Sequence, residues 1–176
     1  MTNKKSGSKI SARMITYIGM LTALEIILNR FLSINAWNIK IGFSFVPVVI
    51  AAVLFGPIAG GAVGALGDFL GAILFPIGPY FPGFTATAFM TGVVFGLFLH
   101  KKQTVPRIAA SVLINQLFFS FIVNSFWISI LYGSPFVPLL ATRIVQVIIV
   151  GAVEFVGITA VTKIAKGAAL KKQITV

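Results

Sequence analysis

Residues 46–55 read VPVVIAAVLF, an unbroken apolar run without a single polar side chain. Backbone groups find no water to bond in the hydrocarbon of a bilayer, so a chain crosses it as helices or as a closed β-barrel. Barrel strands alternate polar and apolar residues, and this run does not alternate. The run therefore favours a bundle of membrane helices.

The composition of the whole chain agrees with this interpretation. Of its 176 residues, 58% are hydrophobic and 10% are charged, and the mean hydropathy is +1.04. Soluble domains carry roughly 25% charged residues, and a soluble fold this poor in charge would expose apolar patches that aggregate.

The residues that several classes of enzymatic chemistry require are absent from the sequence. The chain has no cysteine and no glycine–lysine pair of a phosphate-binding loop, which excludes thiolate chemistry and ATP hydrolysis by this chain. The single histidine, His100, has no cluster of acids and bases beside it in the sequence. We therefore predict no enzymatic activity, no catalytic residue, no metal and no cofactor.

We predict one all-α domain over residues 1–176, a bundle of six transmembrane helices. The spans are placed at residues 11–33, 44–56, 58–76, 82–100, 107–131 and 137–164, with basic tails at 1–10 and 167–176. Gly56 and Pro57 predict a tight turn after the short second span. Three prolines and two glycines between residues 76 and 83 predict a shaped loop.

The 14 lysines and arginines are distributed unevenly over this topology. With the N-terminus in the cytoplasm, eleven lie on cytoplasmic segments and three, Arg30, Lys40 and Arg143, lie on or just below the outer side. This is the positive-inside pattern, and it predicts an even number of spans with both termini cytoplasmic. It also explains the net charge of +11 without a nucleic-acid partner.

Arg30, Lys40 and Arg143 form a predicted cationic mouth, where the topology does not call for cations. One alternative is that these side chains snorkel to lipid phosphates. Arg30 and Arg143 belong to spans with other polar groups, which favours a binding site.

The fifth span carries a polar stripe. Gln116, Ser120, Asn124 and Trp127 lie at i, i+4, i+8 and i+11, within roughly 80° of one another on a straight helix. Polar side chains in hydrocarbon usually face the bundle interior. They serve there either as a binding site or as hydrogen bonds between helices.

The three acidic residues are expected to be structural. Glu154 shares a face of the sixth span with Arg143 but lies about 16 Å deeper, at 1.5 Å per residue. Glu25 and Asp68 are each expected to pair with a buried amide or hydroxyl.

Small residues recur four apart on two spans. In the first span, Gly19 and Ala23 form a step that lets another helix approach closely, either within the chain or from a partner. Gly60, Gly64, Gly67 and Gly71 form a comparable stripe on the third span, which we assign to packing inside the bundle.

Four stretches resemble the substrate-binding S components of energy-coupling factor (ECF) vitamin transporters. They are Asn29-Arg30-Phe31 through IKIGFSFVP at 39–47, LFGP at 54–57, GALGD at 64–68, and FPIGPYFPGFT at 75–85. The last stretch is the most specific and resembles the folate-specific branch.

This resemblance implies a six-helix protein of the bacterial cytoplasmic membrane that binds one vitamin near its outer face. It implies partners as well: a transmembrane scaffold protein and two ATPase subunits that supply the energy. In this family the step Gly19-Met20-Leu21-Thr22-Ala23 is the docking surface for the scaffold, which favours partner docking over internal packing.

The chemistry of folate fits the side chains available. Its pterin and benzoyl rings need aromatic walls and amides, and its glutamate needs cations. We expect the following substrate-binding residues: Arg30, Trp37, Lys40, Tyr80, Phe81, Phe84, Thr85, Gln116, Asn124, Trp127 and Arg143. The alternatives are an S component for a thiamine precursor or pyridoxine, and a self-sufficient secondary transporter coupled through Glu25 and Asp68.

Overall fold

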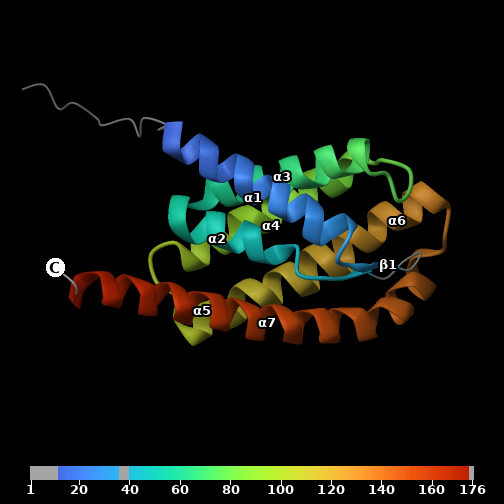
Figure 1. Ribbon diagram of the computed structural model, residues 1–176. Helices are drawn as coiled ribbons and strands as arrows, with labels where there is room; N and C mark the ends of the chain where they lie inside the picture. Colours follow the sequence, from blue (N-terminus) through green and yellow to red (C-terminus); the bar gives the residue numbers. More distant parts are fainter. Residues whose placement is uncertain (1–11, 36–39, 175–176) are drawn as a thin grey trace, which may run out of the picture.

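The computed structural model describes residues 12–35 and 40–174, which form a helical bundle with one small hairpin (Figure 1). In chain order the elements are α1 (Ala12–Arg30), β1 (Ile34–Asn35), β2 (Lys40–Ile41), α2 (Phe45–Phe55), α3 (Pro57–Leu74), α4 (Pro82–Leu99), α5 (Val105–Leu113), η1 (Ile114–Val123), α6 (Asn124–Tyr132) and α7 (Phe136–Ile174). The segments α5, η1 and α6 form one continuous helical stretch of 28 residues.

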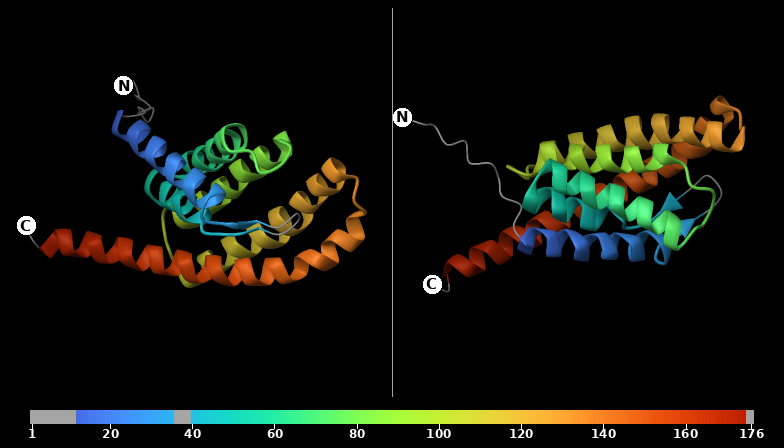
Figure 2. Two further views of the ribbon diagram at one scale, coloured as in Figure 1. Left: turned by 45° about the vertical axis from the view of Figure 1, so that its right-hand side comes forward. Right: turned by 90° about the horizontal axis from the view of Figure 1, so that it is seen from above.

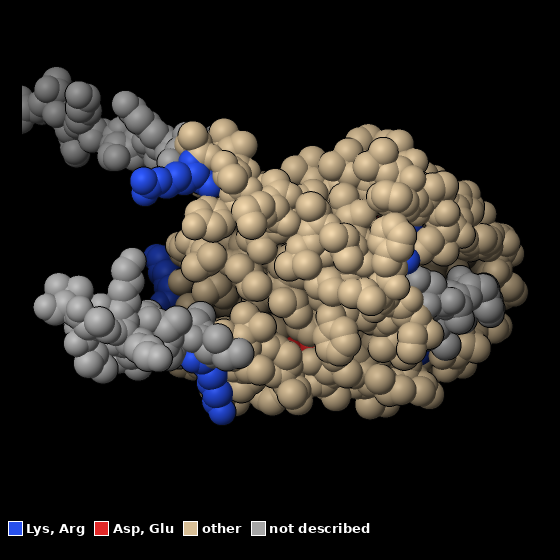
Figure 3. Space-filling model, viewed as in Figure 1, with Lys and Arg blue, Asp and Glu red and all other residues tan. Residues whose placement is uncertain are grey.

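The long helices lie side by side and run in roughly the same direction, so the molecule has two ends (Figures 1 and 2). The start of α1 and the end of α7 lie at one end, which we call the termini end. The hairpin β1–β2, the α3–α4 connection and the start of α7 lie at the other, which we call the hairpin end. Exposed basic side chains gather at the termini end (Figure 3). The exposed lysines and arginines of the described residues are Arg13, Lys101, Lys102, Arg107 and Lys163.

Among the described residues, five helices are long and apolar enough to cross a membrane. They are α1, α3, α4, the stretch Val105–Tyr132, and the part of α7 from Phe136 to Lys163. The second span predicted at residues 44–56 corresponds to α2, which has only 11 residues and is shorter than the other five helices. At 1.5 Å per residue it is about 16 Å long, and the hydrocarbon core is about 30 Å thick.

Helix α2 forms the centre of the core. Its residues Val49, Ala51 and Ala52 are fully enclosed, and it contacts α1, α3, α4 and α7. The core cluster around it is built from Phe45, Val48, Val49, Ala51, Ala52, Val63, Phe95, Leu99, Ile108, Val112 and Ile158. Much of the apolar run 46–55 is therefore enclosed by protein, although Leu54 is 56% exposed.

The turn between α2 and α3 is a single residue, as expected. Gly56 has φ of +94°, a conformation that side chains disfavour. Pro57 then begins α3 at a position where its missing N–H costs nothing. The His100 ring lies against Gly56, and its Nδ1 is 2.9 Å from the Val53 carbonyl oxygen.

Two features were not predicted. The first is the antiparallel hairpin, which pairs Ile34 with Ile41 and Asn35 with Lys40. The second is η1, a ten-residue π-helix in the middle of the fifth long helix. The shaped loop is confirmed, since α3 ends at Leu74 and α4 begins at Pro82. Helix α7 runs on to Ile174, beyond the predicted span.

Candidate binding cavity

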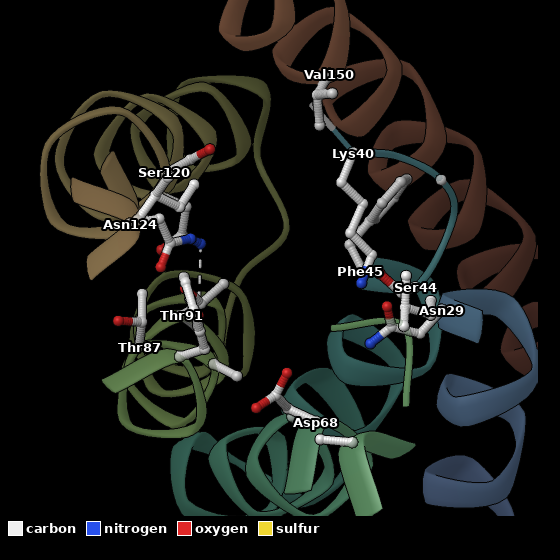
Figure 4. A pocket seen from close by; sticks show the side chains of 18 of the residues that line it. Asn29, Lys40, Ser44, Phe45, Asp68, Thr87, Thr91, Ser120, Asn124 and Val150 are labelled. Atoms are coloured by element: carbon white, nitrogen blue, oxygen red, sulfur yellow. Dashed lines mark hydrogen bonds between the residues drawn. The ribbon is translucent and has the colours of Figure 1, made fainter. Parts of the chain in front are cut away.

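A cavity of about 410 Å³ lies between α1, β2, α2, α3, the α3–α4 connection, α4, η1, α6 and α7 (Figure 4). Ligand sites typically have 300–1,000 Å³. Eight of the predicted residues line it: Arg30, Lys40, Tyr80, Phe81, Phe84, Gln116, Asn124 and Arg143. Of the other three, Thr85 and Trp127 lie behind the wall, and Trp37 lies outside the described residues.

Three separate elements bring the predicted cations to this cavity. Arg30 ends α1, and its Nη2 donates to the Asp68 carbonyl oxygen at 3.4 Å. Arg143 on α7 is 4% exposed, and its Nη2 donates to the Ser120 carbonyl oxygen at 3.2 Å. Side chains that snorkel reach outward to phosphates, whereas these line an internal space.

Lys40 enters the same space from the hairpin, outside the spanning helices. Its carbonyl oxygen accepts a hydrogen bond from Gln146 Nε2 at 3.2 Å, which ties the hairpin to α7. Burial lowers the pKa of the Lys40 ammonium below its ordinary value, and the charge of Arg30 lowers it further. An anion bound beside Lys40 would oppose both effects.

The π-helix η1 aligns the polar stripe with the cavity. Its i→i+5 hydrogen bonds give more than 3.6 residues per turn. Residues four apart are therefore separated by a smaller angle about the helix axis than in an α-helix. Gln116, Ser120 and Asn124 all line the cavity. Trp127 follows in α6, three residues on, and is turned away from it.

The acidic residues have the expected partners, but they also line the cavity. Glu25 Oε1 accepts a hydrogen bond from Asn29 Nδ2 at 2.6 Å. Asp68 Oδ2 accepts one from the Thr85 hydroxyl at 2.7 Å. In Figure 4 the Asp68 side chain points into the cavity from α3. At the floor, Gln116 lies within hydrogen-bonding reach of Glu154.

Several further polar residues of the wall were not among the predicted substrate-binding residues, including Asn29, Ser44, Thr87, Thr91, Asn115, Tyr132 and Gln146. Three of them carried a readable signal. Thr87 and Thr91 are four apart on α4, and Asn115 adjoins the polar stripe. No sequence signal separates Asn29 from a residue that only caps the end of α1.

Buried polar atoms without a hydrogen-bond partner among the described residues mark the cavity as a polar site. They include Glu25 Oε2, Asn29 Oδ1, Asn115 Oδ1, Gln116 Oε1, Asn124 Oδ1 and Glu154 Oε2. A buried polar atom that stays unpaired costs about 1–3 kcal/mol. A bound molecule with several donors would pair such oxygens.

The arrangement suits binding rather than catalysis. Cations, amides and aromatic rings converge on one elongated space, which is the set of groups that a ring-bearing anion requires. The chain belongs to the family of ECF transporter substrate-specific components, whose model matches residues 13–164. It is therefore a transporter component, and its long apolar helices make it a membrane protein.

Its relatives point to one branch of that family. The chain is 42% identical to the folate transporter FolT of Clostridium novyi over 131 residues, which are 74% of this chain and 76% of that protein. It is 27% identical to the folate transporter FolT of Leuconostoc mesenteroides over 158 residues, 86% and 84% of the two chains. Its fold matches a crystal structure of FolT bound with folic acid, with a TM-score of 0.80, 29% identity, and coverage of 85% of this chain and 92% of that one.

Proposed function

We propose that this chain is the folate-binding S component of an ECF importer, capturing the vitamin at the outer face of the bacterial cytoplasmic membrane. The observation that carries the proposal is the convergence of Arg30, Lys40 and Arg143 on one cavity that also has aromatic and amide walls. The folate transporters among its relatives support the same substrate.

Each part of folate has a matching group in the wall. The two carboxylates of the glutamate would pair with Arg30, Lys40 and Arg143, because guanidinium forks bind carboxylates in a bidentate manner. The rings would pack on aromatic residues that line the cavity, among them Tyr80, Phe81 and Phe84. Gln116 and Asn124 offer amide donors and acceptors to the pterin. A role for Trp37 rests on the sequence alone.

The proposed topology has six passes, of which α2 makes the short second one, with both termini cytoplasmic. The clustering of exposed cations at the termini end supports it through the positive-inside rule (Figure 3). Transport would require a transmembrane scaffold and two ATPase subunits, because the sequence holds no nucleotide-binding motif. Gly19 and Ala23 are the proposed docking step for the scaffold.

Isothermal titration of the detergent-purified chain tests the substrate. We expect one folate per protein, bound without ATP or partners. A thiamine compound or pyridoxine is the informative competitor, since Glu25, Asp68 and Glu154 also line the cavity and would suit a cation. Heat with one of these and none with folate would overturn the proposed specificity.

Two charge changes on α7 test the cationic mouth. Arg143→Ala should weaken folate binding by about 2–5 kcal/mol, because the loss of a buried partner strands the other charge. Glu154→Gln keeps the shape of the floor and should have a much smaller effect on affinity. Equal losses from the two changes would mean that Arg143 supports the bundle rather than the ligand.

A further inference from the structure

Trp127 has no surface in the cavity, yet it contacts the residues that form the cavity's aromatic wall. Its indole packs on Phe81 with ring centroids 5.4 Å apart. Phe81 in turn meets Phe84 edge to face at 6.0 Å, and both of these rings line the cavity. Trp127 therefore forms a second layer behind the wall.

A hydrogen-bond chain fixes the indole in this place. Trp127 Nε1 donates to the Thr87 hydroxyl oxygen at 3.0 Å, and that hydroxyl donates to the Gly83 carbonyl oxygen at 2.8 Å. Thr87 is 5% exposed, so the chain is shielded from water. It joins α6 to the first turn of α4.

Gly83 gives the indole its room. A Cβ at residue 83 would lie 2.7 and 2.8 Å from Trp127 Cδ2 and Cε2, and 2.6 Å from Phe81 Cε1. Real Cβ atoms essentially never approach so closely, so any side chain here must displace a ring. The absence of a side chain at Gly83 thus allows the rings of Trp127 and Phe81 to pack beside it.

The segment that these contacts secure is exposed but has contacts of its own, one of them the edge-to-face contact of Tyr80 with Phe69 at 5.8 Å. Residues 75–80 between α3 and α4 are exposed. The Tyr80 hydroxyl meets the Thr85 hydroxyl at 3.2 Å, and Phe75 meets Phe31 edge to face. Phe81 directly follows this segment, so its contact with Trp127 fixes where the segment joins α4.

We propose that Trp127 and Gly83 act as one positioning unit, which holds Phe81 and the start of α4 against the cavity and so slows the escape of bound substrate. The proposal rests on folate binding and assigns Trp127 to the support of the wall rather than to substrate contact. Its effect should fall on the dissociation rate, as most changes at a formed interface do.

A double-mutant cycle tests the unit through the rate of folate dissociation from the full-length protein. Gly83→Ala and Trp127→Ala should each raise this rate about tenfold. In the Trp127→Ala background, Gly83→Ala should add less than about twofold, because the Phe81 ring can then move into the space that the indole has left. Phe118→Ala, which removes an exposed ring from η1 of the same long helix, should leave the rate unchanged.

Additive effects in the cycle, or an unchanged rate in both single variants, would overturn the proposal. Trp127→Phe keeps a ring against Phe81 but loses the hydrogen bond to Thr87, so its rate should lie between wild type and Trp127→Ala. A merely destabilising change at Gly83 would not be rescued by truncating Trp127.

A measurement without ligand separates this proposal from the proposed substrate. Trp37→Phe leaves Trp127 as the single tryptophan. In that background Gly83→Ala should shift its emission to the red and increase its quenching by acrylamide. If wild type binds no folate, the proposed function fails; if Gly83→Ala leaves the fluorescence unchanged, the positioning unit fails.

Discussion

On α3, Gly60 and Gly64 face the backbone of α4, whereas on α1 Gly19 and Ala23 face outward. A Cβ at Gly64 would lie 2.6 Å from the Ala88 carbonyl oxygen, and one at Gly60 would lie 2.7 Å from that of Gly92. A Cβ at Gly19 would meet nothing within 4 Å. Small residues four apart thus mark a close contact in one helix and an open step in the other.

The difference shows what a small-residue spacing can and cannot tell. It indicates that something approaches the helix closely, because shape carries helix association in lipid. It does not say whether that approach comes from the same chain. The assignment of the α3 stripe to internal packing is confirmed, and internal packing is excluded for the described surroundings of Gly19 and Ala23.

The stripe on α3 itself divides into two parts. Gly60 and Gly64 meet α4, while Cβ atoms at Gly67 and Gly71 would meet the side chains of Glu25 and Arg30 on α1. The first pair lets two backbones touch. The second pair makes room for charged side chains that line the cavity, so one stripe serves both packing and the binding site.

The largest expected effect comes from filling the backbone contact. Gly64→Leu should destabilise the bundle by about 3 kcal/mol or more, because overpacking against a backbone carbonyl cannot be relieved by a rotamer change. The yield of monodisperse protein and its melting temperature in detergent measure this. A Gly64→Leu protein as stable as wild type would contradict the packing of α3 on α4.

A smaller effect is expected where the stripe faces Arg30. A Cβ at Gly71 would lie 2.9 Å from Arg30 Nε, the flexible end of a side chain that can move. Gly71→Ala should therefore cost only about 1 kcal/mol of stability. Because Arg30 lines the cavity, folate affinity should fall about tenfold, as for a displaced charge partner. If the variant loses stability but keeps its affinity for folate, Arg30 does not contribute to folate binding.

The smallest effect on the isolated protein is expected at the open step. Gly19→Trp and Ala23→Trp should leave the melting temperature and folate binding nearly unchanged, since both positions are exposed. The same variants should abolish folate uptake in cells that supply the scaffold and ATPases, and co-purification with the scaffold should fall in parallel. Leu24→Trp, at an exposed position turned about 100° or more around α1 from both step residues, is the matched control.

Normal folate uptake by cells that carry the Gly19 and Ala23 variants would mean that the docking surface lies elsewhere on the molecule. A loss of folate binding by the purified variants would instead mean that the step supports the fold.

The candidate site was largely readable because polar and charged groups are costly in hydrocarbon. That cost singled out Arg30, Arg143, Gln116 and Asn124, and all four line the cavity. This cost does not distinguish the residues that line the cavity from those that lie behind them. Trp127 shares the stripe of Gln116 on an ideal α-helix, but the π-helix between them changes their relative rotation.

The sequence by itself determined the class of protein, the long helices, the Gly56 turn and the proline-rich loop, since apolar composition and backbone restrictions act locally. Only the tertiary structure decided that the run 46–55 forms a short helix at the centre of the core, with several of its side chains enclosed by protein rather than by lipid. Lipid and protein interior are equally apolar, so hydrophobicity cannot distinguish the two surroundings. The tertiary structure likewise decided that Asp68 faces the cavity and Trp127 does not, because that depends on helix rotation and on neighbours far away in the chain.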